Sequence, residues 1–210
     1  MGVIGVRDGG DPLMAGLVTV FMRLFESEFV TLEGFGISCR APDGMRYLDE
    51  NGALALLLAD AVGEPRPGPG DPSRSALHAA MYAAWPEVGA IVSGPSRHLR
   101  ALLAERCAMP EPTSMMRKRG VTRLADHLVE AGALDGASRD AALAAARERA
   151  QANGMKHVLV IEPEGTVHVA GMVPADTMAH YSNVEFSARV ECLRIEERIA
   201  QALHMSTASS

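Results

Sequence analysis

The first helix of the chain can be predicted from the spacing of its apolar residues. Asp11 and Pro12 form a good helix start, because an Asp side chain can cap the first turn and Pro lacks an N–H that this turn would leave unpaired. Apolar residues then recur at helical spacing, at Leu13, Leu17, Val20, Phe21, Leu24 and Phe25. This spacing places them on one helix face, so we predict a helix from Pro12 to Glu28.

Five more helices are predicted from the same kind of signal. Asp71 and Pro72 repeat the helix start, and Pro86 closes the helix that follows. Ser138 is a suitable N-cap further along the chain. The predicted helices are Ser73–Trp85, Arg97–Cys107, Val121–Ala131, Ser138–Asn153 and Thr177–Leu203.

Short apolar runs between these helices predict strands. Phe35–Arg40 and Met45–Leu48 flank a Pro-Asp-Gly turn, as in a hairpin. Val88–Val92 is a continuous apolar run, which is typical of a strand buried on both faces. His157–Ile161 and Thr166–Gly171 predict a second hairpin. We expect four valines on its core side, namely Val158, Val160, Val167 and Val169.

The order of these elements indicates the fold class. Helices alternate with short strands, and hairpins stand near both ends. This order predicts an α/β fold in which a central, mainly antiparallel sheet is covered by helices on both sides. Between the first hairpin and the second helix, Ala53–Val62 is mostly apolar. Gly63–Gly70 holds three prolines and three glycines, which indicates an irregular surface loop.

The composition is typical of a globular protein. The chain has 210 residues, of which 48% are apolar and 22% charged, a length that suits one domain with a sizeable core. We expect a single domain over 1–210, with a disordered tail at 206–210. The longest apolar runs, Ala53–Ala59 and Ala79–Trp85, are too short to cross a bilayer. The first residues resemble neither a secretory signal nor a myristoylation site, so we expect a cytoplasmic protein without a membrane partner.

Charge and cysteine content restrict the partners further. The formal net charge is −6 with both signs interspersed, whereas nucleic-acid binding needs clustered Lys and Arg. The one basic cluster, Arg117-Lys118-Arg119, is short and typical of a solvated loop or helix end. We therefore expect no nucleic-acid partner. Three widely spaced cysteines, Cys39, Cys107 and Cys192, favour reduced thiols over a disulfide framework or a zinc site.

One frame in the middle of the chain resembles a known family. Its residues are Ser73, His78, Tyr82, Pro86-Glu87 and Ala90-Ile91-Val92. This frame is similar to that of the class II aldolase/adducin N-terminal domain family, and the element order agrees over Leu13–Leu203. The resemblance implies a class II aldolase-like fold. It also implies a homo-oligomer, a tetramer in the family, with sites between neighbouring subunits.

The same resemblance predicts that the family's metal centre is degenerate here. In the family, three histidines hold a divalent metal, usually zinc, which stabilises the enediolate formed when a carbon–carbon bond breaks. The resemblance places these ligands at Ser93, Pro95 and Glu164. Pro95 has no ligating side chain, Ser93 is a poor ligand, and Glu164 alone would hold a metal weakly. We expect no metal and, with only nine Phe, Trp and Tyr residues for stacking, no other cofactor.

Two further family features are altered. The Ser-Ser-Glu that supplies the family's acid/base carboxylate is Pro72-Ser73-Arg74 in this chain, and Arg cannot take up a proton at neutral pH. The family's phosphate loop corresponds to Glu33-Gly34-Phe35-Gly36-Ile37-Ser38, where Glu33 would repel a phosphate. These residues disfavour a sugar phosphate bound in the family's manner.

The polar residues that remain predict an anion-binding pocket. Arg74, His78 and Tyr82 follow one another at every fourth position on one helix face, where the helix N-terminus and the Arg fork favour a carboxylate or phosphate. We interpret His78 and Tyr82 as candidate catalytic residues for proton transfer. Candidate residues for binding a small anionic molecule are Ser73, Arg74, Ser93 and Glu164. In a purely structural alternative, His78 and Tyr82 bond to backbone and Arg74 pairs with Glu164.

Two other kinds of site have less support in the sequence. His157 and His168 fall on one face of the predicted hairpin, and His98 follows the lost ligand pair, so these three could form a relocated metal site. None of them has a tight ligand spacing. Ser93-Gly94-Pro95-Ser96 contains serine at a turn, but no G-x-S-x-G elbow surrounds it, which disfavours a serine hydrolase.

Three functions stay open on this basis. The first is a metal-independent lyase or isomerase related to the aldolases, acting on a small anionic carbonyl compound. In that case Arg74 supplies charge, and His78 and Tyr82 transfer protons. The alternative is a non-catalytic binding or assembly module, as in adducin. The third is a subunit that completes a site on a different partner chain.

Overall fold

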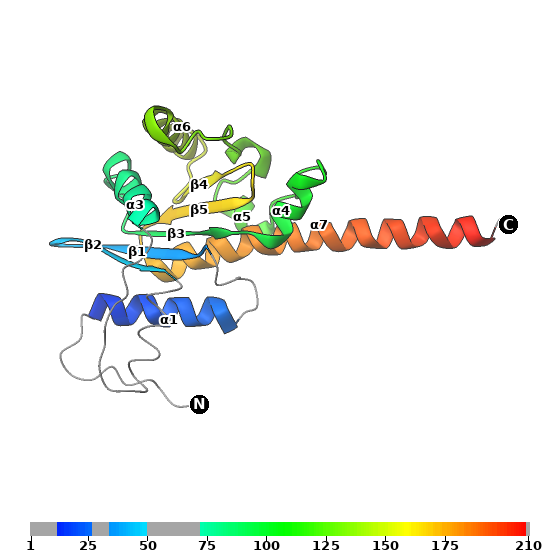
Figure 1. Cartoon of the computed structure of the whole chain (residues 1–210), viewed down its shortest axis with the longest axis horizontal. Coiled ribbons are helices and arrows are strands. Elements are labelled where there is room, and N and C mark those ends of the chain that lie inside the picture. The colour runs from blue at the N-terminus through cyan, green and yellow to red at the C-terminus, as the bar shows by residue number, and fades with distance from the viewer. Residues whose placement is uncertain (1–11, 27–33, 50–71, 209–210) are drawn as a thin grey trace.

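A sheet of five strands forms the centre of the computed structural model, which describes residues 12–26, 34–49 and 72–208 (Figure 1). The strands lie in the order β2-β1-β3-β5-β4, and every neighbouring pair is antiparallel. Their bounds are β1 Gly36–Ala41, β2 Gly44–Asp49, β3 Ala90–Pro95, β4 Val158–Ile161 and β5 Thr166–Gly171. Two hairpins, β1–β2 and β4–β5, are thus joined through β3.

Helices cover both faces of this sheet. In Figure 1, α3 and α6 lie on one side of it, and α1 and α7 on the other. The helices of the described residues are α1 Pro12–Glu26, α3 Pro72–Ala84, α4 Arg97–Ala104, α5 Ser114–Lys118, α6 Arg139–Ala152 and α7 Pro174–Ala208. Short 3₁₀ turns occur at Leu124–His127 and Gly136–Ser138. The predicted α/β fold, with a central antiparallel sheet between helices, is confirmed.

Two apolar cores hold the helices against the sheet. The core on the side of α1, α4 and α7 includes Leu17, Phe21, Phe35, Val92, Leu99, Val169 and Tyr181. The core under α3 and α6 includes Met81, Trp85, Ile91, Leu143 and Val160. In this second core the Trp85 indole N–H donates to the Leu143 carbonyl at 2.9 Å, which links α3 to α6.

The prediction that the four valines of the second hairpin share one side of it is wrong. Val158 and Val160 lie in the core under α3 and α6, whereas Val167 and Val169 lie in the core on the α7 side. The register explains this result, since Val160 pairs with His168 and directly paired residues share a face. Because both faces of the hairpin are buried, its sequence has no single solvent-facing side.

The helix predicted at Val121–Ala131 is absent, and only Leu124–His127 forms a 3₁₀ turn there. Beyond this turn the chain runs along the outer edge of β4. Leu128 forms a parallel bridge with Ile161, and the Val129 N–H donates to the Ile161 carbonyl at 2.9 Å. The segment covers backbone groups that an edge strand would otherwise expose, and this pairing overrides the local helical pattern.

Other boundaries differ less from the predictions. The strand expected at Val88–Val92 is displaced and longer, at Ala90–Pro95. The short α5 lies in a segment expected to be a loop, and its last residue, Lys118, belongs to the predicted basic cluster. All three cysteines are free thiols, as expected. Three predicted features lie outside the described residues, namely 27–28, Ala53–Val62 and Gly63–Gly70.

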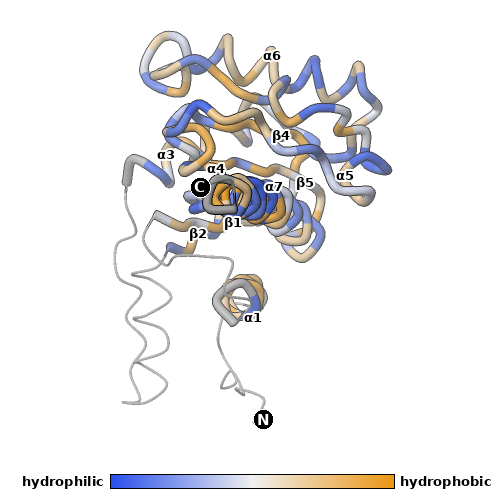
Figure 2. The backbone as a smooth tube through the Cα atoms, turned by 90° about the vertical axis from the view of Figure 1, so that its right-hand side faces the viewer, coloured by the Kyte–Doolittle hydropathy of each residue, from blue (hydrophilic) through white to orange (hydrophobic). Residues whose placement is uncertain are grey.

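The last helix, α7, extends far beyond the body of the protein (Figure 1). It has 35 residues, which corresponds to a length of about 52 Å, and it exceeds the predicted Thr177–Leu203 at both ends. Figure 2 looks along this helix and shows hydrophilic and hydrophobic residues mixed along it. Within the described residues, no helix combines the length and the apolar character needed to span a bilayer.

The turn between β4 and β5 is packed tightly against α4. Gly165 has a φ of +88°, and a Cβ atom at this residue would lie 2.7 Å from the Arg100 Cα. Its carbonyl accepts the Ser96 N–H at 2.9 Å. Because a side chain suits neither this φ nor this space, we expect Gly165→Ala to lower the free energy of unfolding by about 3 kcal/mol. Urea denaturation measures the change.

Gly136 provides a matched control for this substitution. It also has a positive φ, +53°, but no atom lies within 4 Å of the position of an added Cβ. Gly136→Ala should therefore lower the free energy of unfolding by about 1 kcal/mol, the cost of holding an alanine at a positive φ. Equal losses in the two variants would contradict a role for packing against α4.

Candidate functional site

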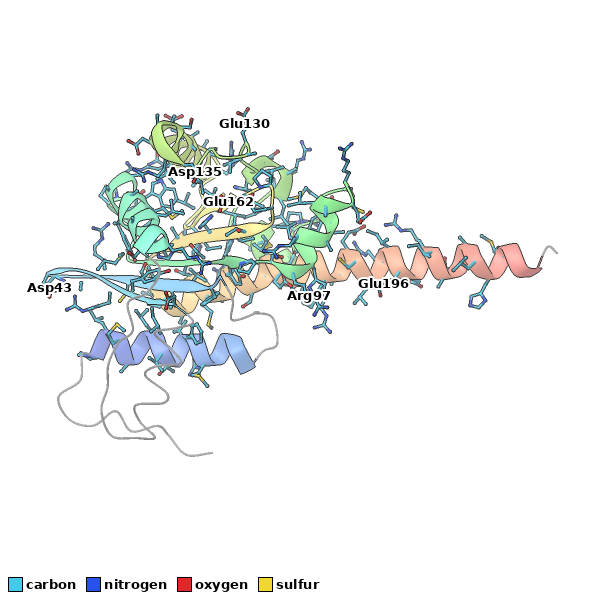
Figure 3. The ribbon with its side chains drawn as sticks, in the orientation of Figure 1. Asp43, Arg97, Glu130, Asp135, Glu162 and Glu196 are labelled. Carbon is cyan, nitrogen blue, oxygen red and sulfur yellow. The ribbon has the colours of Figure 1, made fainter. Side chains whose placement is uncertain are left out.

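A cavity of about 450 Å³ lies between α3, the end of β3 and the β4–β5 turn. Its lining includes the polar side chains of Arg74, His78, Ser93, Arg100, Glu162 and His168. Figure 3 shows Glu162 at the β4–β5 hairpin, within the body of the protein. The volume suits a small molecule, and two guanidinium groups beside one carboxylate favour an anionic one.

The sheet register brings Ser93 and His168 together. These residues are direct partners between β3 and β5, so their side chains leave the same face of the sheet. The Ser93 Oγ and His168 Nδ1 atoms are 2.8 Å apart. On its other side, His168 Nε2 lies 2.7 Å from Oε1 of Glu162, the first residue after β4. The three side chains therefore form a hydrogen-bonded series that ends at the cavity.

α3 places His78 above the same face. Its Nε2 lies 2.8 Å from Ser93 Oγ, and its Nδ1 lies 2.8 Å from Ser38 Oγ on β1. The Ser38 Oγ also lies 3.1 Å from the Tyr82 hydroxyl, one helical turn beyond His78. A continuous hydrogen-bonded series results, here named the polar row, in the order Tyr82, Ser38, His78, Ser93, His168 and Glu162.

Glu162 is the charged end of the polar row. Burial alone would raise the pKa of its carboxyl, but the hydrogen bond and charge of His168, with a hydrogen bond from Glu164, hold this pKa below its ordinary value. For Glu164, burial and the neighbouring Glu162 charge instead raise the pKa. Glu162 is therefore ionised at neutral pH, and its side chain is 19% exposed.

The middle of the polar row is uncharged. Burial, followed by repulsion from His168, lowers the pKa of His78 to about 3. Burial also raises the pKa of the Tyr82 hydroxyl, against the effect of its hydrogen bond with Ser38. At neutral pH the His78 imidazole and the Tyr82 phenol are both neutral, so either can pass a proton along the row without holding a charge.

The structure brings three of the six predicted site residues to the cavity. Arg74, His78 and Ser93 line it, and Ser73 lies in the first turn of α3. Tyr82 does not line the cavity, because it is buried at the far end of the polar row. Tyr82 therefore cannot touch a ligand in this cavity.

The predicted ion pair between Arg74 and Glu164 does not form. Glu164 is exposed and interacts with Glu162, while its carbonyl accepts the Arg100 Nε–H at 3.2 Å. Arg74 lines the cavity and does not fill it. Of the predicted phosphate loop, Glu33 lies outside the described residues, and Gly34 lines the cavity.

Sequence reasoning missed Ser38, Arg100 and Glu162 and gave His168 a different role. Ser38 and His168 each interrupt a strand that is otherwise mostly apolar. A polar side chain at a buried strand position needs a polar partner. These two interruptions were therefore the signal in the sequence that Ser38 and His168 belong to a polar site. The identity of the partners depends on strand register, which the sequence alone did not provide.

The relocated metal site is not formed by His98, His157 and His168. His98 Nδ1 lies 2.5 Å from Glu185 on α7, and His157 Nε2 lies 3.1 Å from Asp176. Val160 pairs with His168 and so shares its face of the sheet. His157 precedes Val160 by an odd number of positions and therefore lies on the opposite face, so the expectation of one face is wrong. No group of three metal-ligating side chains occurs within 12–26, 34–49 and 72–208.

The three positions that the resemblance assigns to metal ligands do not fit a zinc centre. The Ser93 Oγ already bonds two imidazole nitrogens. Pro95 has no donor atom in its side chain, and its ring packs against Gly34. Glu164 is the one carboxylate of the set, whereas zinc in proteins takes three or four His, Cys or carboxylate ligands.

Solved structures with the same fold are class II aldolase superfamily members. An L-fuculose 1-phosphate aldolase superposes with a TM-score of 0.61 over 91% of this chain and 90% of its own, at 16% identity. YgbL from Klebsiella pneumoniae, named as a candidate aldolase, epimerase or decarboxylase, gives 0.59 over 85% and 87%, at 18% identity. The L-fuculose-1-phosphate aldolase from Thermus thermophilus gives 0.57 over 90% and 96%, at 17% identity.

These similarities establish a class II aldolase-like fold. At such low identity they concern the fold and not the activity. No family model and no curated protein matches the sequence. The function must therefore be argued from the side chains around the cavity.

Proposed function

We propose that this protein is a metal-independent relative of the class II aldolases, in the lyase or isomerase class. It abstracts a proton next to the carbonyl group of a small anionic compound. The observation that carries the proposal is the combination, in one cavity, of two arginines with an ionised carboxylate that His168 holds in place.

The arginines supply the charge that such a reaction needs. Removing a proton next to a carbonyl group leaves an enolate, whose oxygen carries nearly a full negative charge. Arg74 and Arg100 both line the cavity, and each brings a positively charged guanidinium group. One can bind the anionic group of the substrate while the other faces the developing oxyanion. Substrate binding and charge stabilisation then come from the same pair of residues.

Glu162 is the base in this proposal. Its carboxylate is ionised at neutral pH, reaches the cavity, and is oriented by the His168 N–H. His168 is held in turn by Ser93, so the carboxylate cannot rotate freely. The same carboxylate can return the proton to a neighbouring atom, which gives an isomerisation, or receive it from a hydroxyl group before a carbon–carbon bond breaks, which gives a lyase.

Tyr82 then acts at a distance from the substrate, whereas His78 lines the cavity and acts through Ser93. The polar row connects them to Ser93 and His168, and it holds both imidazole rings in place. Ser73, in the first turn of α3, and Glu164, in the β4–β5 turn, are proposed to assist binding of the anion. No nucleic acid, membrane or cofactor is part of the proposal.

A ligand screen tests the binding half of the proposal. We expect small keto acids and keto phosphates, such as pyruvate and dihydroxyacetone phosphate, to include one that stabilises the protein. At ten times the Kd this is about 1.4 kcal/mol, or about 4 °C in the midpoint of thermal unfolding. Arg74→Ala should abolish the shift, because the charge that holds the anion is lost.

Arg97→Ala is the matched control. Arg97 begins α4 and is exposed, on the outside of the body in Figure 3. A shift that persists in Arg74→Ala, or that disappears equally in Arg97→Ala, contradicts the proposed pocket. No shift with any of these compounds contradicts the anionic carbonyl substrate.

A second candidate function is a non-catalytic assembly module, and the shape of α7 favours it. The outer part of this helix exposes large apolar side chains, namely Leu193, Ile199, Leu203 and Met205. The last three of them lie beyond Cys192 and Ile195, which pack on the core. A homo-oligomer, such as the tetramer expected from the resemblance, would cover them. A stable homo-oligomer without any ligand shift would favour this function.

A further inference from the structure

Ser93 is the one hydroxyl group that lies between two imidazoles at the wall of the cavity, among the described residues. Its Oγ is 2.8 Å from His78 Nε2 and 2.8 Å from His168 Nδ1. The residue is 7% exposed and lines the cavity. A serine in contact with a histidine that is held by a carboxylate has the arrangement of a nucleophile and its base.

The ionised end of the polar row determines the direction of its hydrogen bonds. Glu162 can only accept, so His168 donates its Nε2–H to it. A histidine that acts as a base must offer one unprotonated nitrogen, so His168 Nδ1 accepts in that state and Ser93 donates its O–H to it. The Ser93 Oγ must in turn accept from the Nε2–H of His78, whose Nδ1 accepts from Ser38.

These assignments leave one lone pair on the Ser93 oxygen. The four tetrahedral directions around Oγ are taken by the bond to Cβ, the O–H directed at His168, the lone pair that accepts from His78, and one further lone pair. The O–H and the first lone pair point along the polar row, toward His168 and His78. Ser93 also lines the cavity. The remaining lone pair is therefore the one available to a molecule in the cavity.

We propose that Ser93 is a nucleophile that His168 and Glu162 activate, and that it transfers the acyl group of a small anionic ester or thioester to water. The Ser93 oxygen bonds to the acyl carbon while its proton passes to His168 Nδ1. The bond from that carbon to the leaving oxygen or sulfur breaks, and His168 returns the proton to the leaving group. Water then attacks the acyl-serine, gives a proton to His168, and releases the acid as the Ser93 hydroxyl regains its proton.

The surroundings of Ser93 support this chemistry in two ways. The His78 N–H stabilises negative charge on the serine oxygen as its proton departs. The positive charges of Arg74 and Arg100 at the same cavity select an acyl group that carries a carboxylate. With about 450 Å³ available, a short dicarboxylic half-ester fits, whereas a long acyl chain does not.

The ring nitrogens of His168 are used in the opposite order from the serine proteases, in which Nε2 faces the serine and Nδ1 the carboxylate. This order follows from the register, because His168 and Ser93 are direct partners and Glu162 lies beyond the end of β4. Either nitrogen of an imidazole can act as the base when the other N–H is held by a carboxylate.

This activity goes beyond the proposed lyase or isomerase function and does not depend on it. Proton abstraction by Glu162 requires no covalent bond to Ser93. Labelling of Ser93 by an ester reports acylation alone, whereas exchange of a carbon-bound proton with deuterium reports proton abstraction alone. The two proposals can fail separately.

The 4-nitrophenyl half-ester of succinic acid is the probe for the test. We expect wild-type protein to release nitrophenolate and to gain the mass of one succinyl group, which tandem mass spectrometry locates on Ser93. Ser93→Ala should lose both signals. Ser138→Ala should keep them, because Ser138 is exposed and makes no side-chain capping bond. Glu162→Gln should slow acylation by about a hundredfold or more.

A neutral probe, 4-nitrophenyl acetate, tests the preference for an anionic acyl group. We expect it to react about tenfold more slowly than the half-ester, and Arg74→Ala to remove the difference. An unlabelled wild-type protein, or a succinyl group on any residue other than Ser93, overturns the proposal. The location of the label in wild-type protein decides the question even if Ser93→Ala does not fold.

Discussion

Acidification from about pH 7.5 to about pH 4.5 is expected to remove several kcal/mol of folding free energy. Three histidines have a low pKa, mainly because they are buried. The pKa is lowered to about 3 for His78 and His180 and to about 4 for His127. In the unfolded chain each has a pKa near 6.5. Below that pH the unfolded chain takes up protons that the folded protein cannot accept.

The sign and size of the effect follow from this difference. The stabilisation is fully present above pH 6.5 and is lost as the pH falls toward the folded pKa values. Each such histidine removes about 1.4 kcal/mol per pH unit below 6.5. Three of them together could remove about 8 kcal/mol over two pH units, which is a large share of the stability of an ordinary domain. Urea denaturation at a series of pH values measures the loss.

His180 offers the sharpest variant for this test. It is fully buried, stacks on His157 at 4.8 Å between ring centroids, and neither of its ring nitrogens has a hydrogen-bond partner in the described part of the chain. His180→Leu should therefore raise the stability at neutral pH by about 1–2 kcal/mol. It should also reduce the pH slope by about 1.4 kcal/mol per unit.

Gln201→Leu, on the exposed outer part of α7, replaces a side chain that does not titrate; it is the control and should leave the slope unchanged. A free energy of unfolding that stays constant between about pH 7 and about pH 5 would show that these histidines are already protonated in the folded protein. In that case the neutral state assigned to His78 in the polar row would also be wrong.

The second large effect is expected at Glu162. If this carboxylate is the base, Glu162→Gln should slow exchange of the substrate's carbon-bound proton with deuterium by about 10²–10⁴-fold, because the amide keeps the shape but cannot take up a proton. The exchange is followed by NMR, with a ligand identified by thermal shift. In the wild type the rate should fall only below pH 4.5, since the pKa of Glu162 is lowered.

Glu130→Gln is the matched control, because Glu130 is an exposed glutamate away from the cavity (Figure 3). It should exchange at the wild-type rate. A Glu162→Gln rate within about twofold of wild type would rule out this carboxylate as the base, since general-base catalysis contributes at least about a hundredfold. Binding of the same ligand by both variants would show that the loss concerns the proton transfer step.

The elements with strong local signals were predictable from the sequence. The Asp-Pro pairs predicted two helix starts, and α1 and α3 begin at Pro12 and Pro72. The Pro-Asp-Gly sequence predicted a turn, and β1 and β2 flank it. These signals act over a few residues, so no tertiary information was needed. At Val121–Ala131 the local pattern was helical, but pairing with Ile161 determined the structure.

The candidate site was predictable only in its α3 part. Arg74, His78 and Tyr82 share a helix face, and helical spacing is enough to show this. The contact of Ser93 with His168 joins residues 75 positions apart and depends on the register of β3 and β5. The sequence offered only an unexplained polar residue in each strand. No G-x-S-x-G elbow surrounds Ser93, because its partners converge through the sheet and not along the chain.

Trp85 gives this protein a built-in optical reporter. It is the only tryptophan in the sequence, it is fully buried, and its indole joins α3 to α6. Fluorescence excited at the indole band therefore comes from one location. A red shift of that emission would signal water entering between these two helices, behind the wall of the cavity that α3 provides, and could be followed in real time without any added dye.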